Sequence, residues 1–124
     1  GSGLPGIPYA LMHPQALVYL IERSRDKCVF LRHVVDLLGL RRVEVLETDP
    51  LKGDPNKYEA VITRAFSPKR DLNRAVSRLL ASGGRFYALG TLAPLLDCNF
   101  TPGRVIPSPE SAGLKLYEYI FSPK

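Results

Sequence analysis

The stretch VYLIERSRDKCVFLRHVVDLLGL (Val18–Leu40) predicts a strand followed by a helix, and this unit decides the fold of the chain. The strand is the short apolar run Ala16–Glu22, which is rich in strand-forming residues and too short for a helix. From Cys28 to Leu38 the apolar residues recur three and four positions apart, as one buried face of a helix requires. Gly39 then stands where helices commonly end on a glycine. A strand that leads into such a helix is typical of a sheet covered by helices.

The same alternation continues along the chain, after an opening loop and helix. Further strands are predicted at Arg42–Glu47, Tyr58–Phe66, Arg85–Gly90 and Leu114–Phe121, with a helix at Asp71–Leu80. The Ser-Gly-Gly at 82–84 ends that helical pattern. The three prolines within 101–109 exclude an ordinary long helix there and predict a loop.

Short apolar strands that alternate with amphipathic helices predict an α/β fold. We expect an open, mostly parallel sheet with helices on both faces. The final strand, Leu114–Phe121, mixes polar and apolar residues, which predicts an antiparallel or edge position. The 124 residues suffice for one compact core, and a single domain over 1–124 is predicted.

Charge and composition narrow the classes of partner. The net charge is +5, from 17 basic and 12 acidic residues, which favours a polyanionic partner but also fits a plain solvated surface. No apolar run reaches the ~20 residues that cross a bilayer, and no signal-peptide layout is present, so no membrane association is expected. Cys28 and Cys98 lack metal-site spacing, which predicts buried free thiols, no metal and a reducing compartment.

The candidate binding residues follow the strands, because ligands of open α/β sheets bind at the carboxyl ends of strands. Glu22 closes its strand 19 residues after Gly3. An acid there accepts hydrogen bonds from the two hydroxyls of an adenosine ribose. The alternative is an acid favoured by the dipole of the following helix. The glycines at positions 1, 3 and 6 fit a cofactor loop by spacing, or a cloning remnant followed by a proline turn.

Several segments, taken in order, resemble the RsmG family, also called GidB. They are GLPGIP, VYLIERSRDKCVFLRHVVDLLGL, VEVLE, ITRAFSP and LLASGGRFYALGT, within 3–91. Members are bacterial guanine-N7 methyltransferases of small-subunit ribosomal RNA, with the class I S-adenosylmethionine-dependent fold. The resemblance implies S-adenosyl-L-methionine as cofactor, ribosomal RNA or a ribosomal particle as partner, a cytoplasmic location and a monomer.

The resemblance also assigns roles to individual positions. The cofactor contacts that it implies are Gly1, Gly3, Leu4, Glu22, Asp49, Pro50, Leu51 and Arg64. Arg64, Lys69 and Arg70 are the candidates for RNA contact. The alternative for Asp49 is a turn-forming role before Pro50, and the alternative for Arg64 is a surface ion pair.

Other side chains are candidates from their residue types alone. A group of basic residues around the second strand and its helix could neutralise RNA phosphates if it lies on the cofactor face: Arg23, Arg25, Lys27, Arg32, Arg41 and Arg42. Tyr9, Tyr58 and Phe66 could stack a flipped base. No catalytic residue is predicted, because guanine N7 carries a free lone pair, and structural roles are expected for His13 and His33.

Four features depart from the family pattern. The family's first strand and preceding helices are absent, so the chain is predicted to be N-terminally incomplete. The adenine segment reads TDPLK, the segment ALGT has no lysine, and 101–109 has no clear counterpart. A class I methyltransferase with another acceptor, or a catalytically idle RNA- or protein-binding domain on this fold, stays open. A dinucleotide-dependent dehydrogenase is disfavoured, because GLPGIP departs from the glycine pattern that opens a long Rossmann helix.

Overall fold

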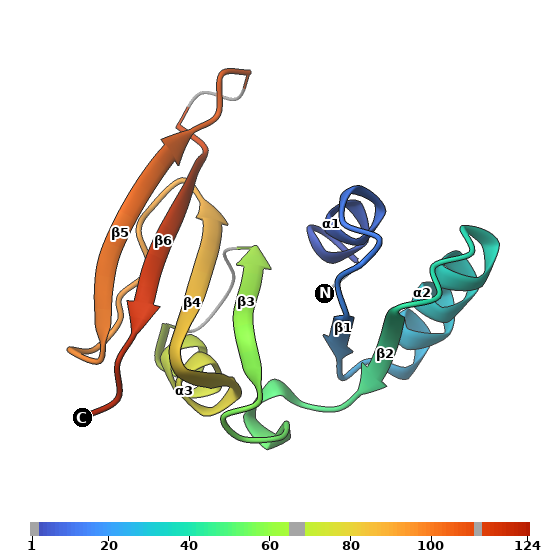
Figure 1. The fold of residues 1–124 in the computed structure, drawn as a ribbon, viewed down its shortest axis with the longest axis horizontal. Coiled ribbons are helices and arrows are strands. Elements are labelled where there is room, and N and C mark those ends of the chain that lie inside the picture. Colours follow the sequence, from blue (N-terminus) through green and yellow to red (C-terminus); the bar gives the residue numbers. More distant parts are fainter. Residues whose placement is uncertain (1–2, 65–68, 111–112) are drawn as a thin grey trace. The chain divides into compact units, whose positions relative to one another are not determined.

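The computed structural model describes residues 3–64, 69–110 and 113–124. The chain divides into two compact units, Gly1–Lys52 (unit 1) and Gly53–Lys124 (unit 2), each with its own sheet (Figure 1). The single domain over 1–124 stays a prediction.

Unit 1 is built around two parallel strands. Its elements are α1 (Gly6–Met12), β1 (Val18–Glu22), α2 (Arg25–Leu37), β2 (Val43–Glu47) and the short 3-10 helix η1 (Pro50–Lys52). Val18 pairs with Val43 at the start of the strands and Glu22 with Glu47 at their ends. The predicted strand, helix and strand are therefore confirmed, with boundaries shifted by one to three residues.

Local chemistry sets both ends of α2. The Ser24 Oγ accepts a hydrogen bond from the Lys27 N–H at 3.4 Å, which caps the helix at its amino end. Gly39 takes a φ of +65° just past the other end, a conformation that costs glycine little. Between these ends Cys28 and Leu31 are fully buried, which anchors the helix on the strands.

Unit 2 is a four-stranded sheet in the order β3-β4-β6-β5. Its elements are β3 (Tyr58–Arg64), α3 (Lys69–Leu79), β4 (Leu80–Gly90), β5 (Phe100–Pro107) and β6 (Lys115–Phe121). β3 and β4 are parallel, whereas β6 runs antiparallel to both β4 and β5. The core joins Leu72 and Val76 of α3 to aromatic residues of the sheet, with the Phe86 and Tyr119 rings stacked 6.1 Å apart.

In unit 2 one predicted loop is a strand, and one predicted strand begins earlier than expected. The proline-rich stretch 101–109 is largely strand β5, which lies at the edge of the sheet (Figure 1), where a missing N–H is tolerated. The prediction of an antiparallel or edge position for β6 is confirmed, since β6 is antiparallel to both neighbours and lies between β4 and β5. β4 begins at Leu80 rather than Arg85. Tyr58 pairs with Leu80 and Ala60 with Arg85, so residues 81–84, which include the Ser-Gly-Gly, form an irregularity inside the strand.

The predictions for the two cysteines are confirmed in part. Cys28 and Cys98 are both free, as predicted, but Cys98 is exposed rather than buried. Across the described residues, no helix is both long and apolar enough to cross a membrane.

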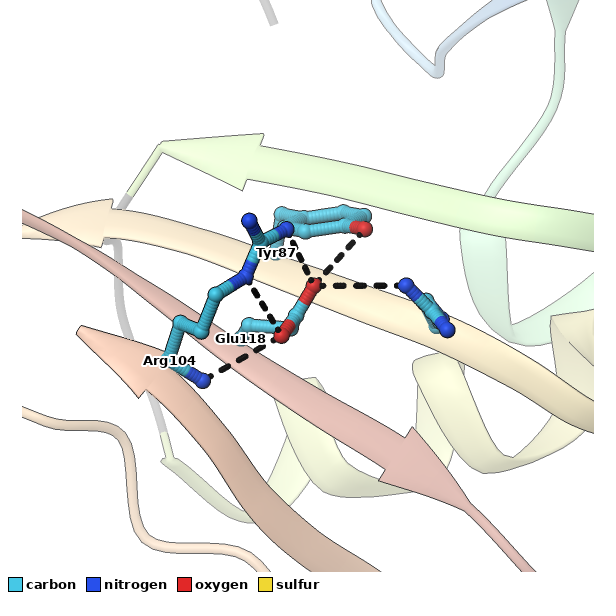
Figure 2. A network of polar contacts seen from close by, with 4 residues as sticks. Tyr87, Arg104 and Glu118 are labelled. Atoms are coloured by element: carbon cyan, nitrogen blue, oxygen red, sulfur yellow. Dashed lines mark hydrogen bonds and ion pairs between the residues drawn. The ribbon is translucent and has the colours of Figure 1, made fainter. Parts of the chain in front are cut away.

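One polar network ties the edge strand to the rest of unit 2. Glu118 of β6 is 8% exposed, and its carboxylate accepts hydrogen bonds from the Tyr87 hydroxyl at 3.0 Å and from the backbone and guanidinium of Arg104 at 3.1–3.2 Å (Figure 2). Arg85 adds an ion pair at 3.6 Å. A Cβ on Gly103 would lie 2.6 Å from the Glu118 Oε1, so β5 approaches the carboxylate closely only because this residue is glycine.

We expect the network to make unit 2 sensitive to acid. Hydrogen bonds from the Arg104 side chain and backbone hold the pKa of Glu118 down, to about 2. Because this folded-state pKa is depressed, the stabilisation is present above the ordinary value of 4.5 and is lost as the pH falls through about 2. The urea midpoint of the native chain should therefore exceed that of Glu118→Gln at pH 6, and the gap should narrow between pH 4.5 and pH 2. A gap that stays constant over this range would contradict the assignment.

Candidate functional site

Glu22 is held at the carboxyl end of β1, as predicted from the sequence. It is 7% exposed, and its Oε2 accepts a hydrogen bond from the Ser24 N–H at 2.7 Å. Its backbone carbonyl accepts from the Cys28 Sγ–H at 3.2 Å and from the Thr48 N–H at 3.0 Å. The side chain therefore stands where a strand, a helix start and the end of the neighbouring strand converge.

The electrostatics of this position favour the ionised carboxylate. Burial acts to raise the pKa of Glu22, but the Ser24 N–H and the charge of Lys27 outweigh it, so the pKa lies below its usual range. An ionised carboxylate has only acceptor sites, about four in all. Glu22 can thus hold hydroxyl donors of a ligand together with the N–H of the β1–α2 turn.

The glycine-rich segment packs on the same side of β1 as Glu22. A Cβ on Gly6 would collide with the Leu20 side chain, and Leu20 and Glu22 share a face of the strand. Gly3 has a φ of +93°, and a Cβ there would lie 2.8 Å from the side chains of both Ile7 and Leu31. The structure therefore explains these glycines by close packing on β1 and α2. Leu4 is exposed beside them, and Gly1 lies outside the described residues.

The segment after β2 forms a tight turn. The Asp49 Oδ1 accepts a hydrogen bond from the Leu51 N–H at 2.9 Å, and the Asp49 carbonyl accepts from the Lys52 N–H at 2.8 Å. This is the turn-forming role that was the alternative for Asp49. Pro50 and Leu51, in η1, are half-buried beside it. Glu22 at the end of β1 pairs with Glu47 at the end of the neighbouring strand β2. The turn that follows β2 therefore begins beside the strand end that carries Glu22.

The remaining predicted residues belong to unit 2. Arg64 is exposed and ends β3, where it pairs in register with Leu89, one residue before the end of β4. Arg64 is thus at a carboxyl end, as predicted, and it forms no side-chain hydrogen bond or ion pair with the part of the chain that the structure describes. Lys69 and Arg70 begin α3, but their side chains lie outside the description. So does Phe66.

The predicted basic group is divided. Arg23 and Arg25 follow the carboxyl end of β1, whereas Arg41 and Arg42 precede the amino end of β2. Arg32 forms an ion pair with Glu47 at 3.8 Å. The condition that the basic residues lie on the cofactor face is therefore not met by Arg41 and Arg42, which lie at the opposite end of the strands.

Sequence reasoning missed the backbone contacts around Glu22. Ser24 before a helical pattern is a recognisable cap signal, but the contacts of Cys28 and Thr48 depend on register and packing. Among the described residues, no group of three His, Cys, Asp or Glu side chains could hold a metal ion.

Comparison with protein families gives one match over most of the chain. The model of the GidB family, described as rRNA small subunit methyltransferase G, matches residues 1–99.

Curated proteins with this description are similar to the same part of the chain. Ribosomal RNA small subunit methyltransferase G of Cellvibrio japonicus is 39% identical over 95 residues, which cover 76% of this chain and 43% of that protein. The protein of Borrelia turicatae with the same name is 42% identical over 88 residues, covering 71% of this chain and 42% of that protein. The chain therefore spans less than half the length of these relatives.

Solved structures establish the fold. The chain matches a mutant of MtNAS in complex with S-adenosylmethionine with a TM-score of 0.79 at 21% identity, over 97% of this chain and 51% of that one. A predicted O-methyltransferase, protein Atu636 from Agrobacterium tumefaciens, matches with a TM-score of 0.76 at 22% identity, over 100% of this chain and 71% of that one. The predicted α/β fold of class I methyltransferases is confirmed.

Two glycine variants separate packing from backbone conformation. Gly39→Ala places a Cβ in open space at a φ of +65°, so we expect a loss of about 1 kcal/mol in unfolding free energy. Gly3→Ala adds contacts with Ile7 and Leu31, and we expect a loss of about 2–3 kcal/mol. Urea unfolding followed by circular dichroism measures both. Equal losses would contradict the close packing of the segment.

Proposed function

Because this chain belongs to the GidB family of rRNA small subunit methyltransferases, we propose that it forms part of an S-adenosylmethionine-dependent enzyme that methylates guanine N7 in small-subunit ribosomal RNA. The observation that carries the proposal is the buried, ionised carboxylate of Glu22 at the carboxyl end of β1. Ligands of open α/β sheets bind at this end of the strands.

The donor set of unit 1 suits the nucleoside part of S-adenosylmethionine. Glu22 would accept hydrogen bonds from the two ribose hydroxyls, since an ionised carboxylate has acceptor sites only. The turn at Asp49–Leu51 follows the neighbouring strand, and the half-buried Pro50 and Leu51 offer apolar surface to an adenine ring. Gly3 and Leu4 would contact the donor from the glycine-rich segment.

The proposed reaction needs no catalytic base from the chain. Bound S-adenosylmethionine supplies an electrophilic methyl group on a sulfonium centre, and guanine N7 offers its lone pair directly. The residues of the chain therefore act by holding the two reactants ~3–3.5 Å apart and in line.

Arg64 would act on the RNA rather than on the reacting base. A guanidinium near the purine would oppose the positive charge that develops on it, whereas a phosphate accepts the guanidinium in a two-point contact. Arg64 is exposed at the end of β3, where a phosphate can reach it. Lys69 and Arg70 follow it in sequence and are proposed for the same task.

Donor binding tests the role of Glu22. In the full chain, Glu22→Gln removes the charge and half of the acceptor set, so we expect the affinity for S-adenosylmethionine in calorimetry to fall about 10- to 100-fold. Glu47→Gln is the matched control, because Glu47 ends the neighbouring strand but is exposed and paired with Arg32. An unchanged affinity for Glu22→Gln would refute the ribose role.

Transfer of labelled methyl groups identifies the acceptor. We expect the label on N7 of guanine in deproteinised small-subunit ribosomal RNA or in the small ribosomal particle. Label in protein or in a small molecule would favour another acceptor. Binding of RNA with no heat from S-adenosylmethionine or its demethylated product would favour an idle RNA-binding domain.

A further inference from the structure

A cleft of about 550 Å³ lies in unit 1 at the end of the strands opposite Glu22. Ala16 lines it just before β1, and Val43 lines it at the first residue of β2. Because β1 rises about 3.3 Å per residue, this end lies roughly 13 Å from the carboxyl end of the strand. The cleft is therefore separate from the candidate donor site.

Two adjacent arginines give the cleft its charge. Arg41 and Arg42 line it together, and no acidic residue is part of the lining. Both are exposed, and neither has a side-chain hydrogen bond or ion pair within 3–64, 69–110 and 113–124. Three other arginines, at 32, 74 and 104, form ion pairs with Glu47, Asp71 and Glu118. The cleft thus presents two guanidinium groups to an external anion.

The backbone holds these arginines in place. The Val18 N–H donates to the Arg42 carbonyl at 2.9 Å, and the Leu40 N–H donates to the Val35 carbonyl at 3.0 Å. Gly39, with its positive φ, turns the chain inside the loop that the Leu40–Val35 bond closes, just before the two arginines. The arginines therefore sit on a turn fixed at both ends, so little backbone order has to be gained on binding.

The rest of the cleft is uncharged, with an aromatic pair close in sequence. Pro14 and Leu40 contribute apolar lining, and Gln15 contributes an amide. The rings of Tyr9 and His13 lie 4.4 Å apart, and Tyr9 is 39% exposed. Their neighbours Ala10 and Pro14 line the cleft. Guanidinium groups beside apolar and aromatic surface are the combination by which proteins hold single-stranded nucleic acids.

We propose that this cleft binds the sugar-phosphate backbone of single-stranded RNA, with Arg41 and Arg42 on phosphates, as a second contact for the substrate away from the donor site. The proposal rests on the proposed function, since it deepens how an RNA methyltransferase holds its substrate. Tyr9 and His13 are not part of the lining, but they adjoin the lining residues Ala10 and Pro14 in sequence and would offer a stacking surface to a neighbouring base. A phosphate suits the pair because each guanidinium offers it two parallel hydrogen bonds.

The test is RNA affinity as a function of salt, in the full chain. The probe is a short single-stranded RNA oligonucleotide followed by fluorescence anisotropy, with S-adenosylmethionine calorimetry in parallel. For Arg41→Gln/Arg42→Gln we expect about a tenfold loss of affinity at low salt and a salt slope shallower by about 1.4, which is two phosphate contacts. The substitution removes exposed side chains, whereas the Val18 contact uses backbone, so donor affinity should not change.

The matched control is Lys57→Gln/Arg74→Gln. It removes the same net charge from two exposed side chains that already pair with Asp54 and Asp71, and we expect its salt slope to equal that of the native chain. An Arg41→Gln/Arg42→Gln slope equal to the native one, or an equal change in the control, would overturn the proposal. Failure of the native chain to bind the RNA at all would also overturn this proposal, whereas the proposed function is overturned only when no methyl group is transferred to ribosomal RNA or to the small ribosomal particle.

Discussion

The hydrogen bond between the Ser24 N–H and the Glu22 carboxylate is the contact on which the arrangement of unit 1 depends. It joins the end of β1 to the start of α2, and it fixes the position of the Glu22 carboxylate at the end of β1. The Thr48 N–H then ties β2 to the carbonyl of the same residue. One glutamate thus contacts a strand, the start of a helix and the turn that follows the neighbouring strand.

The sequence predicted the regular elements well where periodicity and end signals agreed. The strand Val18–Glu22, the helix Arg25–Leu37 and the final strand all follow from apolar spacing. β5 was missed because proline usually argues against a strand, and only its edge position makes Pro102 and Pro107 tolerable. The early start of β4 depends on Gly84, whose missing Cβ would lie 2.8 Å from the Ala81 carbonyl. That approach is a tertiary property that no local pattern reveals.

Part of the candidate site was also predictable from the sequence, because local patterns mark the ends of strands. The position of Glu22 follows from a strand end and a family motif, both legible along the chain. The turn at Asp49 followed from its Asp-Pro pair. Arg25 follows the predicted strand Ala16–Glu22, whereas Arg41 precedes the predicted strand Arg42–Glu47. The predicted strands therefore already placed these two arginines at opposite ends of the sheet.

The outer edge of unit 2 has a consequence for association between chains. Within the part of the chain that the structure describes, β5 is paired along one side only, with β6. An open edge of this kind invites a foreign strand to add itself. Two prolines among its eight residues cannot donate a backbone hydrogen bond. A register shift between Pro102 and Val105 further breaks the regular ladder that such an addition would copy. The same irregularities that hid this strand from pattern analysis thus oppose the edge-to-edge addition of a foreign strand at β5.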